Sequence, residues 1–322
     1  MTAGIPCRLY GAVLALMAGG AHAQAYPSKP VRFIVPFAAG GSADIVARLL
    51  APKLGEQLGQ TIVIDNRPGA SAIIGVEAGA KAPPDGYTVT LGGFSSHVIN
   101  AFLFPKLPYD PVRDFAAITV LTRIPNVLSA HPSVPVRSVP ELIAFARARP
   151  GEITYASSGS GSSQHLSGVL LEKLAGIRIT HVPYRSGAPA VTDLIGGHVA
   201  TMFATMPAAV PHIRTGRLRA LGVTAAKRSP ALPAVPAIAE TVKGYDIATY
   251  YSAHVPAGTP KDIVARLYAA FAKVLLAPDI KERLAAEGAE VVANTPDEFA
   301  AQLKAEHVRW GPIIRESGVR AE

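Results

Sequence analysis

The segment Val31–Asp44 has the sequence VRFIVPFAAGGSAD, a short apolar run followed by residues that interrupt it. Pro36 and the pair Gly40-Gly41 end the run, and apolar residues then recur at helical spacing: Ile45, Val46, Leu49 and Leu50. A strand, a glycine-containing turn and a helix in this order form the first half of a βαβ unit. The segment therefore predicts an α/β fold. Pro52 falls within the helical pattern, where it removes an N–H group and should kink or end the helix.

The same alternation of strand and helix continues along the chain. Short apolar runs predict further strands at 61–65, 88–94, 127–130, 153–156, 178–184, 200–205 and 218–224. A Ser or Thr cap with Pro and an acidic residue marks helix starts at Ser138–Glu141, Thr259–Asp262 and Thr295–Glu298. Parallel βαβ units follow from this order. Because no linker divides the chain, we expect two lobes made of discontinuous segments, with 26–124 plus 251–322 in the first lobe and 125–250 in the second.

Residues 1–25 are typical of a secretory signal peptide. Arg8 precedes an apolar run at 9–18, which is shorter than the roughly 20 residues of a membrane span. Cleavage after Ala23 or after Ala25 is equally compatible with the small residues there. We therefore predict export to the periplasm. The only cysteine, Cys7, lies in this segment, so the mature chain has no disulfide or thiolate chemistry.

The charge pattern argues against a nucleic-acid partner. The formal net charge is +8, but Lys and Arg are scattered without a basic run or interleaved aromatic residues. A basic surface of this kind attracts anionic solutes weakly.

Three strand-to-helix loops have a composition that suits anion binding: 37–44, 92–97 and 157–165. Their glycines allow sharp turns, their serines donate hydrogen bonds, and the N–H groups at the start of a helix favour a carboxylate or phosphate. Each loop also has a plainer interpretation, as a tight turn, a capped strand end or a flexible linker, respectively. The third loop lies directly between a strand and a helix, which favours a binding loop.

Motifs of enzymes are incomplete. Gly159-x-Gly161-x-x-Gln164 lacks the third glycine of a dinucleotide fingerprint, and Arg185 stands where an acidic residue is needed. The chain has no G-x-S-x-G or H-E-x-x-H motif, and Ser163 and His165 do not face each other on a helix. We predict no catalytic residue, metal or cofactor, and hence no enzyme. An enzyme acting on a carboxylate remains the alternative, which turnover of a bound ligand would favour.

Several motifs in register resemble the Bug family, the solute receptors of tripartite tricarboxylate transporters. They are Tyr26–Phe37, Gly40-Gly41-x-x-Asp44, Asn66–Ala70, Pro84–Thr88, Leu107–Pro111, Ser162–Leu166, His181–Tyr184, Arg219–Thr224 and Pro256–Pro260. The resemblance covers nearly the whole mature chain.

The resemblance implies a type II periplasmic binding fold, with two α/β lobes around a central cleft. It implies a monomeric receptor that binds a small carboxylate through backbone N–H groups, hydroxyls and water, without an arginine clamp. Di- and tricarboxylates, acidic amino acids and aromatic carboxylates are all candidate ligands. The partner would be a membrane permease or, in some members, a sensor protein such as a sensor kinase.

The site residues implied by the resemblance come from the three loops and two later positions. They are Phe37, Ala38, Ala39, Gly40, Gly41, Ser42, Ala43, Asp44, Ser95, Ser96, His97, Ser158, Gly159, Ser160, Gly161, Ser162, Ser163, Gln164, His165, Tyr184 and Ala204. Four of these depart from the family pattern, which often has Pro at 38 and 39, Thr at 43 and Asp at 204. The missing acid at Ala204 argues against an amino-acid ligand.

Overall fold

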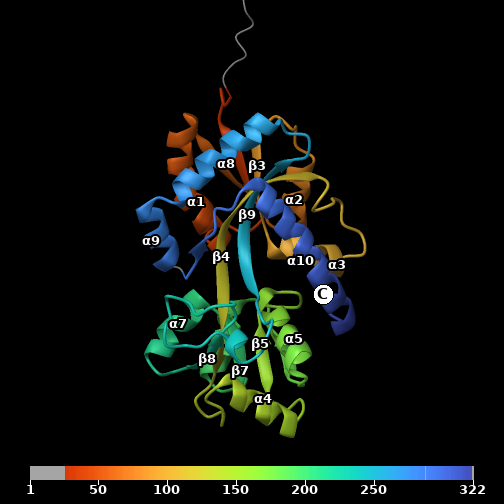
Figure 1. Ribbon diagram of the computed structural model, residues 1–322, viewed down its shortest axis with the longest axis vertical. Coiled ribbons are helices and arrows are strands. Elements are labelled where there is room, and N and C mark those ends of the chain that lie inside the picture. The colour runs from red at the N-terminus through yellow and green to blue at the C-terminus, as the bar shows by residue number, and fades with distance from the viewer. Residues whose placement is uncertain (1–25, 287, 321–322) are drawn as a thin grey trace, which may run out of the picture.

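The computed structural model describes residues 26–286 and 288–320, which form two α/β lobes (Figure 1). This architecture confirms the predicted fold class. The predicted signal peptide and Cys7 lie outside the described residues. Within 26–286 and 288–320, no helix has both the length and the apolar character needed to cross a membrane.

The first lobe contains a sheet that begins with three parallel strands, β1 (Val31–Val35), β2 (Ile62–Asn66) and β3 (Thr88–Gly93). Its helices are α1 (Ser42–Leu58), α2 (Ile73–Ala80), α3 (Asn100–Leu103), α8 (Lys261–Leu275) and α9 (Pro278–Ala286). Two short turns, η2 (Ala70–Ala72) and η3 (Ser95–Ile99), precede α2 and α3. Buried side chains of β1, α1 and α8 form the core of this lobe.

The second lobe has its own parallel strands, β5 (Thr154–Ser157), β6 (Thr180–Pro183) and β7 (Thr201–Thr205), with β5 between the other two. β8 (Arg219–Val223) pairs with β4. The helices are α4 (Val139–Ala148), α5 (Ser163–Ala175), α6 (Gly187–Ile195), α7 (Met206–Arg214) and the short η4 (Ile238–Glu240).

Two long strands connect the lobes. β4 (Phe115–Ala130) pairs antiparallel with β9 (Ala248–Pro256) up to Pro125, and from Asn126 onward it pairs antiparallel with β7 (Figure 1). The sequence predicted only the last four residues of β4 and no strand at 248–256. The sheet is therefore mixed, and the expectation of parallel pairing holds only on either side of these strands. The lobe boundaries at 124/125 and 250/251 stay a prediction.

The C-terminal helix α10 (Pro296–Ser317) follows the short strand β10 (Glu290–Val291) and extends from the first lobe toward the second (Figure 1). Phe299 and Trp310 on this helix belong to the same buried cluster as residues of the second lobe. Near its end, Glu316 Oε2 accepts from Lys173 Nζ of α5 at 2.5 Å. The helix therefore contacts both lobes across the connecting strands.

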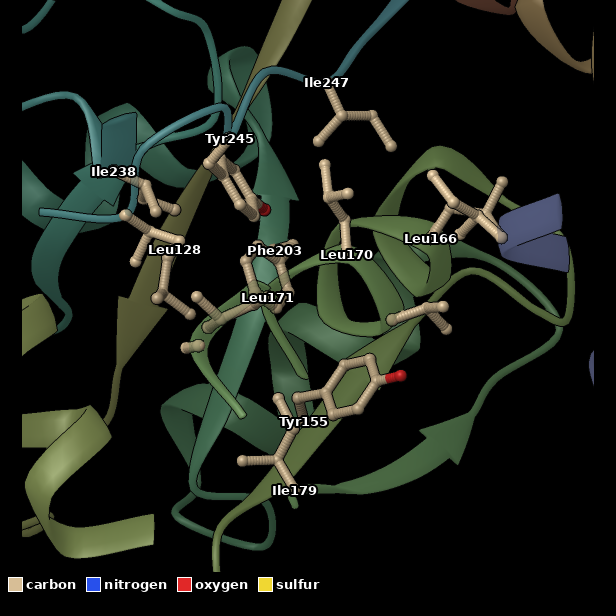
Figure 2. Packing of buried hydrophobic residues seen from close by; sticks show 14 of the residues in the cluster. Leu128, Tyr155, Leu166, Leu170, Leu171, Ile179, Phe203, Ile238, Tyr245 and Ile247 are labelled. Carbon is tan, nitrogen blue, oxygen red and sulfur yellow. The ribbon is translucent and has the colours of Figure 1, made fainter. Parts of the chain in front are cut away.

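Packing in the second lobe fixes the position of α5 (Figure 2). Leu170 of α5 points toward Ile247, and both belong to one buried cluster with Leu166, Phe203 of β7 and Tyr155 of β5. The Tyr245 hydroxyl donates to the Ser167 carbonyl at 2.9 Å. These contacts hold the N-terminus of α5 beside the ends of the strands.

The predicted helix starts have mixed outcomes. Ser138 and Thr295 are N-caps that accept from the backbone, as predicted. The cap at Thr259 is wrong: α8 begins after Pro260, and the Thr259 hydroxyl donates to the Pro256 carbonyl instead, at 2.7 Å. α1 does not end at Pro52 but continues to Leu58. Burial of leucines on both sides of the proline, Leu50, Leu54 and Leu58, compensates for one lost hydrogen bond.

Candidate ligand cavity between the lobes

A cavity of about 610 Å³ opens where loops of both lobes meet. Its lining includes ten of the predicted site residues: Phe37, Ala38, Ser95, Ser158, Gly159, Ser160, Gly161, Ser162, Ser163 and Tyr184. The rest of the lining was not predicted from the sequence: Pro36, Pro68, Gly69, Ser71, Ala72, Asn100, Leu103, Phe104, Arg185, Thr249 and Tyr251. The three predicted loops thus converge, together with the end of β6 and one face of β9.

The loop Ser158–Ser163, here called the serine loop, is held in place by the first turn of α5. Ser162 caps the helix by accepting from the His165 N–H at 3.2 Å, and its hydroxyl donates to the Gly159 carbonyl at 2.7 Å. The Ser158 N–H donates to Gln164 Oε1 at 2.7 Å. Gln164 therefore helps to fix the conformation of the serine loop without lining the cavity. The first-turn N–H groups of α5 have no partner within the helix, and of its first two residues Ser163 lines the cavity.

Two stacked histidines support the serine loop from behind. The rings of His165 and His181 lie 3.7 Å apart, and His165 Nδ1 accepts from the Gly161 N–H at 3.1 Å. Burial, and secondarily the neighbouring His181, lowers the pKa of His165 to about 3. His165 is therefore neutral near pH 7 and its nitrogen can accept. The structure places it outside the cavity lining, in a supporting position.

In the first loop, only Phe37 and Ala38 of the predicted residues line the cavity. Asp44 is buried, and its carboxylate accepts from the Gly40 N–H at 2.8 Å and from Asn66 Nδ2 at 2.9 Å. A hydrogen bond from Arg48 contributes most to lowering the pKa of Asp44 to about 2. Asp44 thus holds the turn closed. The residues between Ala38 and Asp44 are likewise not among the lining residues: Ala39, Gly40, Gly41, Ser42 and Ala43.

The hydroxyl of Ser42 nevertheless contacts the cavity wall. It lies 2.5 Å from the hydroxyl of Tyr251. The Phe37 ring packs edge-on against the Tyr251 ring, with 6.3 Å between the two ring centroids. Thr249 and Tyr251 face this cavity, whereas Ala248 and Tyr250 face a smaller cavity of about 330 Å³. This follows from the alternation of side chains along a strand. β9 therefore separates the two cavities.

The second loop forms a π-helical turn that starts at Ser95 and continues into α3. Such turns are rare and concentrate at functional sites. Ser95 lines the cavity, but Ser96 and His97 are fully buried behind it. The His97 ring stacks on His254 of β9 at 3.9 Å, and burial lowers its pKa to about 3. The structure thus places Ser96 and His97 in the core.

Ala204 is also fully buried, in β7, where it pairs with Val127 of β4. Tyr184, by contrast, lines the cavity, and its hydroxyl donates to Asp193 Oδ2 at 2.7 Å. Desolvation and then Asp193 raise the pKa of Tyr184 to about 12.

The loop Gly69–Ala72 contributes backbone in an unusual conformation. Ala70, Ser71 and Ala72 have φ values of 45°, 53° and 74°, in the left-handed region that residues with a side chain rarely adopt. Asn100 Nδ2 donates to the Ser71 carbonyl at 2.9 Å and ties this loop to α3. Strained segments of this kind cluster at binding sites. The sequence indicated a turn at Asn66–Gly69 but gave no signal for left-handed alanines.

The lobes touch at Gly161. A Cβ atom placed there would lie 2.3 Å from Leu103 Cδ1, so the serine loop of the second lobe packs closely on α3 of the first. Gly161 also has a φ of +77°, which favours glycine. Across this contact, the cavity offers hydroxyls, backbone N–H groups and one guanidinium. Among the described residues, no group of three or more His, Cys, Asp or Glu residues could bind a metal. The arrangement is suited to holding an anion by hydrogen bonds.

Two α/β lobes joined by two strands, with a cavity between their loops, define a two-lobed solute-binding protein of the periplasmic type. The family model described as the tripartite tricarboxylate transporter family receptor matches residues 46–319. The chain belongs to this family, which confirms the resemblance seen in the sequence.

Individual relatives agree with this assignment. Protein BugT of Bordetella pertussis is 38% identical over 306 residues, which cover 94% of each chain. The solved structure of R. palustris Rpa4515 with adipate is 40% identical, covers 92% of this chain and 99% of that one, and has a TM-score of 0.79. The periplasmic binding protein BugD is 33% identical, covers 92% and 100% of the two chains, and has a TM-score of 0.75.

Proposed function

We propose that this protein is an exported, non-enzymatic receptor that binds a small carboxylate in the cavity between its lobes. The observation that carries the proposal is the serine loop at the N-terminus of α5, which faces the cavity with hydroxyls and first-turn N–H groups. Neutral donors of this kind bind a carboxylate strongly when the helix dipole also points at it.

The dimensions of the cavity support the same ligand class. About 610 Å³ lies in the range of small-molecule sites, and Phe37, Leu103 and Phe104 supply apolar surface beside the polar loop. The adipate in the relative Rpa4515 is a carboxylate of suitable size. We propose that the ligand stabilises a closed arrangement of the lobes.

The proposed partner is the membrane permease of a tripartite tricarboxylate importer, which would take the solute from the closed receptor in the periplasm. The support for this step is membership of the receptor family.

Thermal unfolding of the purified mature protein tests carboxylate binding. The protein is first unfolded and refolded to remove any ligand acquired during expression, and is then heated with each member of a carboxylate panel and with the matching amides. A carboxylate at about 100 times its dissociation constant should stabilise the protein by about 2.7 kcal/mol. That corresponds to an increase of a few degrees in melting temperature for a chain of this size.

The amides serve as the matched control, because they keep the shape of each ligand without its charge. An increase with a carboxylate but not with its amide, and recovery of the ligand unchanged by mass spectrometry, is the expected result. Equal increases with both, or conversion of the ligand, would contradict the proposed receptor function.

A further inference from the structure

The cavity contains a single formally charged side chain. Of the described residues that line it, only Arg185 carries a charge near pH 7; the others are apolar, small or neutral polar residues. A ligand with one carboxylate could be held by the neutral donors of the serine loop alone. The guanidinium is therefore an additional feature that the proposed function does not use.

Arg185 is also unpaired. The side chain is exposed, and within the described part of the chain it forms no ion pair or hydrogen bond. The acidic residue in contact with its neighbour, Asp193, is engaged by the Tyr184 hydroxyl at 2.7 Å. Asp193 thereby fixes Tyr184 and leaves the adjacent guanidinium free for an external anion.

Arg185 lies away from the side of the cavity that β9 forms. It follows β6, the last strand in the sheet order, whereas Thr249 and Tyr251 belong to β9. Three strands, β4, β7 and β5, lie between β9 and β6 in that order. Neighbouring strands are spaced by about 4.8 Å, so the cavity extends over several strand widths. Apolar residues, Phe37, Leu103 and Phe104, contribute to the lining as well.

We propose that Arg185 determines specificity for a ligand with a second anionic group, which it pairs with at the β6 side while the neutral donors hold the first carboxylate. This inference rests on the proposed carboxylate-binding function. Arg185 can form two parallel hydrogen bonds with a carboxylate, a geometry that neutral hydroxyls cannot supply. The ligand class is then a dicarboxylate whose two anionic groups lie at the ends of the neighbouring strands β5 and β6.

Titration calorimetry with linear α,ω-dicarboxylates of four to eight carbons, and with the half-amide of each, tests the inference. The wild-type protein should bind its preferred dicarboxylate about tenfold or more tightly than the half-amide, because the half-amide lacks one charge-assisted contact. In R185Q this preference should fall to about twofold or less. R185K, which keeps the charge, should prefer the dicarboxylate more than R185Q does.

R217Q is the matched control, because Arg217 is another exposed arginine of the second lobe outside the cavity lining. It removes the same charge, so any change caused only by the net charge of the protein appears in both variants. R217Q should keep the wild-type preference. Circular dichroism of each variant confirms that the fold is intact.

The outcomes separate this inference from the proposed function. Equal affinity of the wild type for dicarboxylates and half-amides, or an unchanged preference in R185Q, would overturn the role of Arg185 and leave carboxylate binding intact. A wild-type protein that binds none of these carboxylates and no monocarboxylate would overturn both.

Discussion

Gly161 is one of the residues at which the two lobes meet, and two separate observations favour glycine there. Its φ is +77°, and a side chain would approach Leu103 Cδ1 to 2.3 Å. The first effect strains the serine loop, and the second requires the Leu103 side chain or the loop to shift. Because the loop also lines the cavity, the inter-lobe contact and the proposed ligand site share this residue.

Gly161→Ala should therefore weaken carboxylate affinity by about fivefold or more, because the added methyl group would press on Leu103 and shift the loop that lines the cavity. Titration calorimetry measures the change. Gly176→Ala is a suitable control, because Gly176 has a φ of +61° but a Cβ atom added there would meet no atom within 4 Å. Both variants should lose stability, and only G161A should lose affinity. Equal affinities for G161A and the wild type would refute the inter-lobe role.

Asp44 is a second single residue with a large effect, and it stabilises the folded protein through its charge. Its pKa is lowered to about 2, chiefly by Arg48, compared with an ordinary value of 3.8. The unfolded chain binds the proton more tightly than the folded one, so this stabilisation is complete above about pH 4 and is lost as the pH falls toward 2.

Asp44→Asn should lower the free energy of unfolding near pH 7 by about 2 kcal/mol. Urea unfolding at a series of pH values measures the effect. The difference between the variant and the wild type should shrink between pH 4 and pH 2. A difference that is constant over this range would show that the charge of Asp44 contributes nothing.

At the scale of elements, the strand-to-helix connections determine which groups reach the cavity. The serine loop is short, and its path is fixed by the hydrogen bond from the Ser162 hydroxyl to the Gly159 carbonyl and by that from the Ser158 N–H to Gln164 Oε1. The loop Gly69–Ala72 reaches the cavity through consecutive left-handed residues. A backbone this strained persists only because the surrounding contacts, such as Asn100 to the Ser71 carbonyl, hold it.

Ala70→Gly should raise the stability by about 0.5–1 kcal/mol, because Ala70 has a φ of 45° and its exposed methyl contributes little burial. Thermal unfolding detects the change. Ala78→Gly, in the regular helix α2, is the control and should lower the stability by about 1 kcal/mol. Destabilisation by both substitutions would mean that the left-handed loop is not strained.

The same elements show what a sequence can and cannot predict here. Strand runs such as Val31–Val35 and the capping residues Ser138 and Thr295 were found from local patterns, because their causes lie within a few residues. The strand β9 was missed, since its length and pairing depend on β4, which is distant in sequence.

Site prediction has the same limit. The serine loop carries its signal in its own composition, and the structure places it along the cavity. His97 and Ser96 have suitable chemistry, but whether such groups face the cavity or the core depends on the π-helical turn that turns them toward His254. Arg185 lines the cavity only because β6 ends beside β5, a neighbour that spacing alone does not reveal.

At the scale of the whole molecule, buried histidines make the stability of the folded protein depend on pH. Burial lowers the pKa of His97 and of His165 to about 3, and it lowers the pKa of His254 well below its usual value. Each is neutral in the folded protein, whereas in the unfolded chain it takes up a proton near pH 6.5. The unfolded state therefore binds more protons below pH 6.5, and the stability falls as the pH decreases from there.

The melting temperature should thus decrease between pH 7 and pH 5, with a loss of up to about 1.4 kcal/mol per pH unit for each histidine. Scanning calorimetry at several pH values measures this. His165→Gln removes one such group and should flatten the dependence. A melting temperature that is independent of pH from 7 to 5 would contradict the neutral state of these histidines.

The arrangement of the lobes makes one site out of loops that are far apart in sequence. β4 and β9 hold the lobes together and α10 contacts both (Figure 1). The cavity lies where the serine loop meets α3. We propose that the ligand contacts both lobes at once. Loss of a donor in the serine loop should therefore weaken binding without unfolding the protein.

Titration calorimetry of the refolded wild-type protein and of Ser163→Ala, with the carboxylate that raises the melting temperature most, tests this most directly. Ser186→Ala is the control, because Ser186 lies outside the cavity lining and makes no side-chain capping bond. S163A should bind about three- to tenfold more weakly, the effect of one lost hydrogen bond, while S186A binds as the wild type does. Equal affinities for all three proteins would show that the carboxylate does not bind at the serine loop.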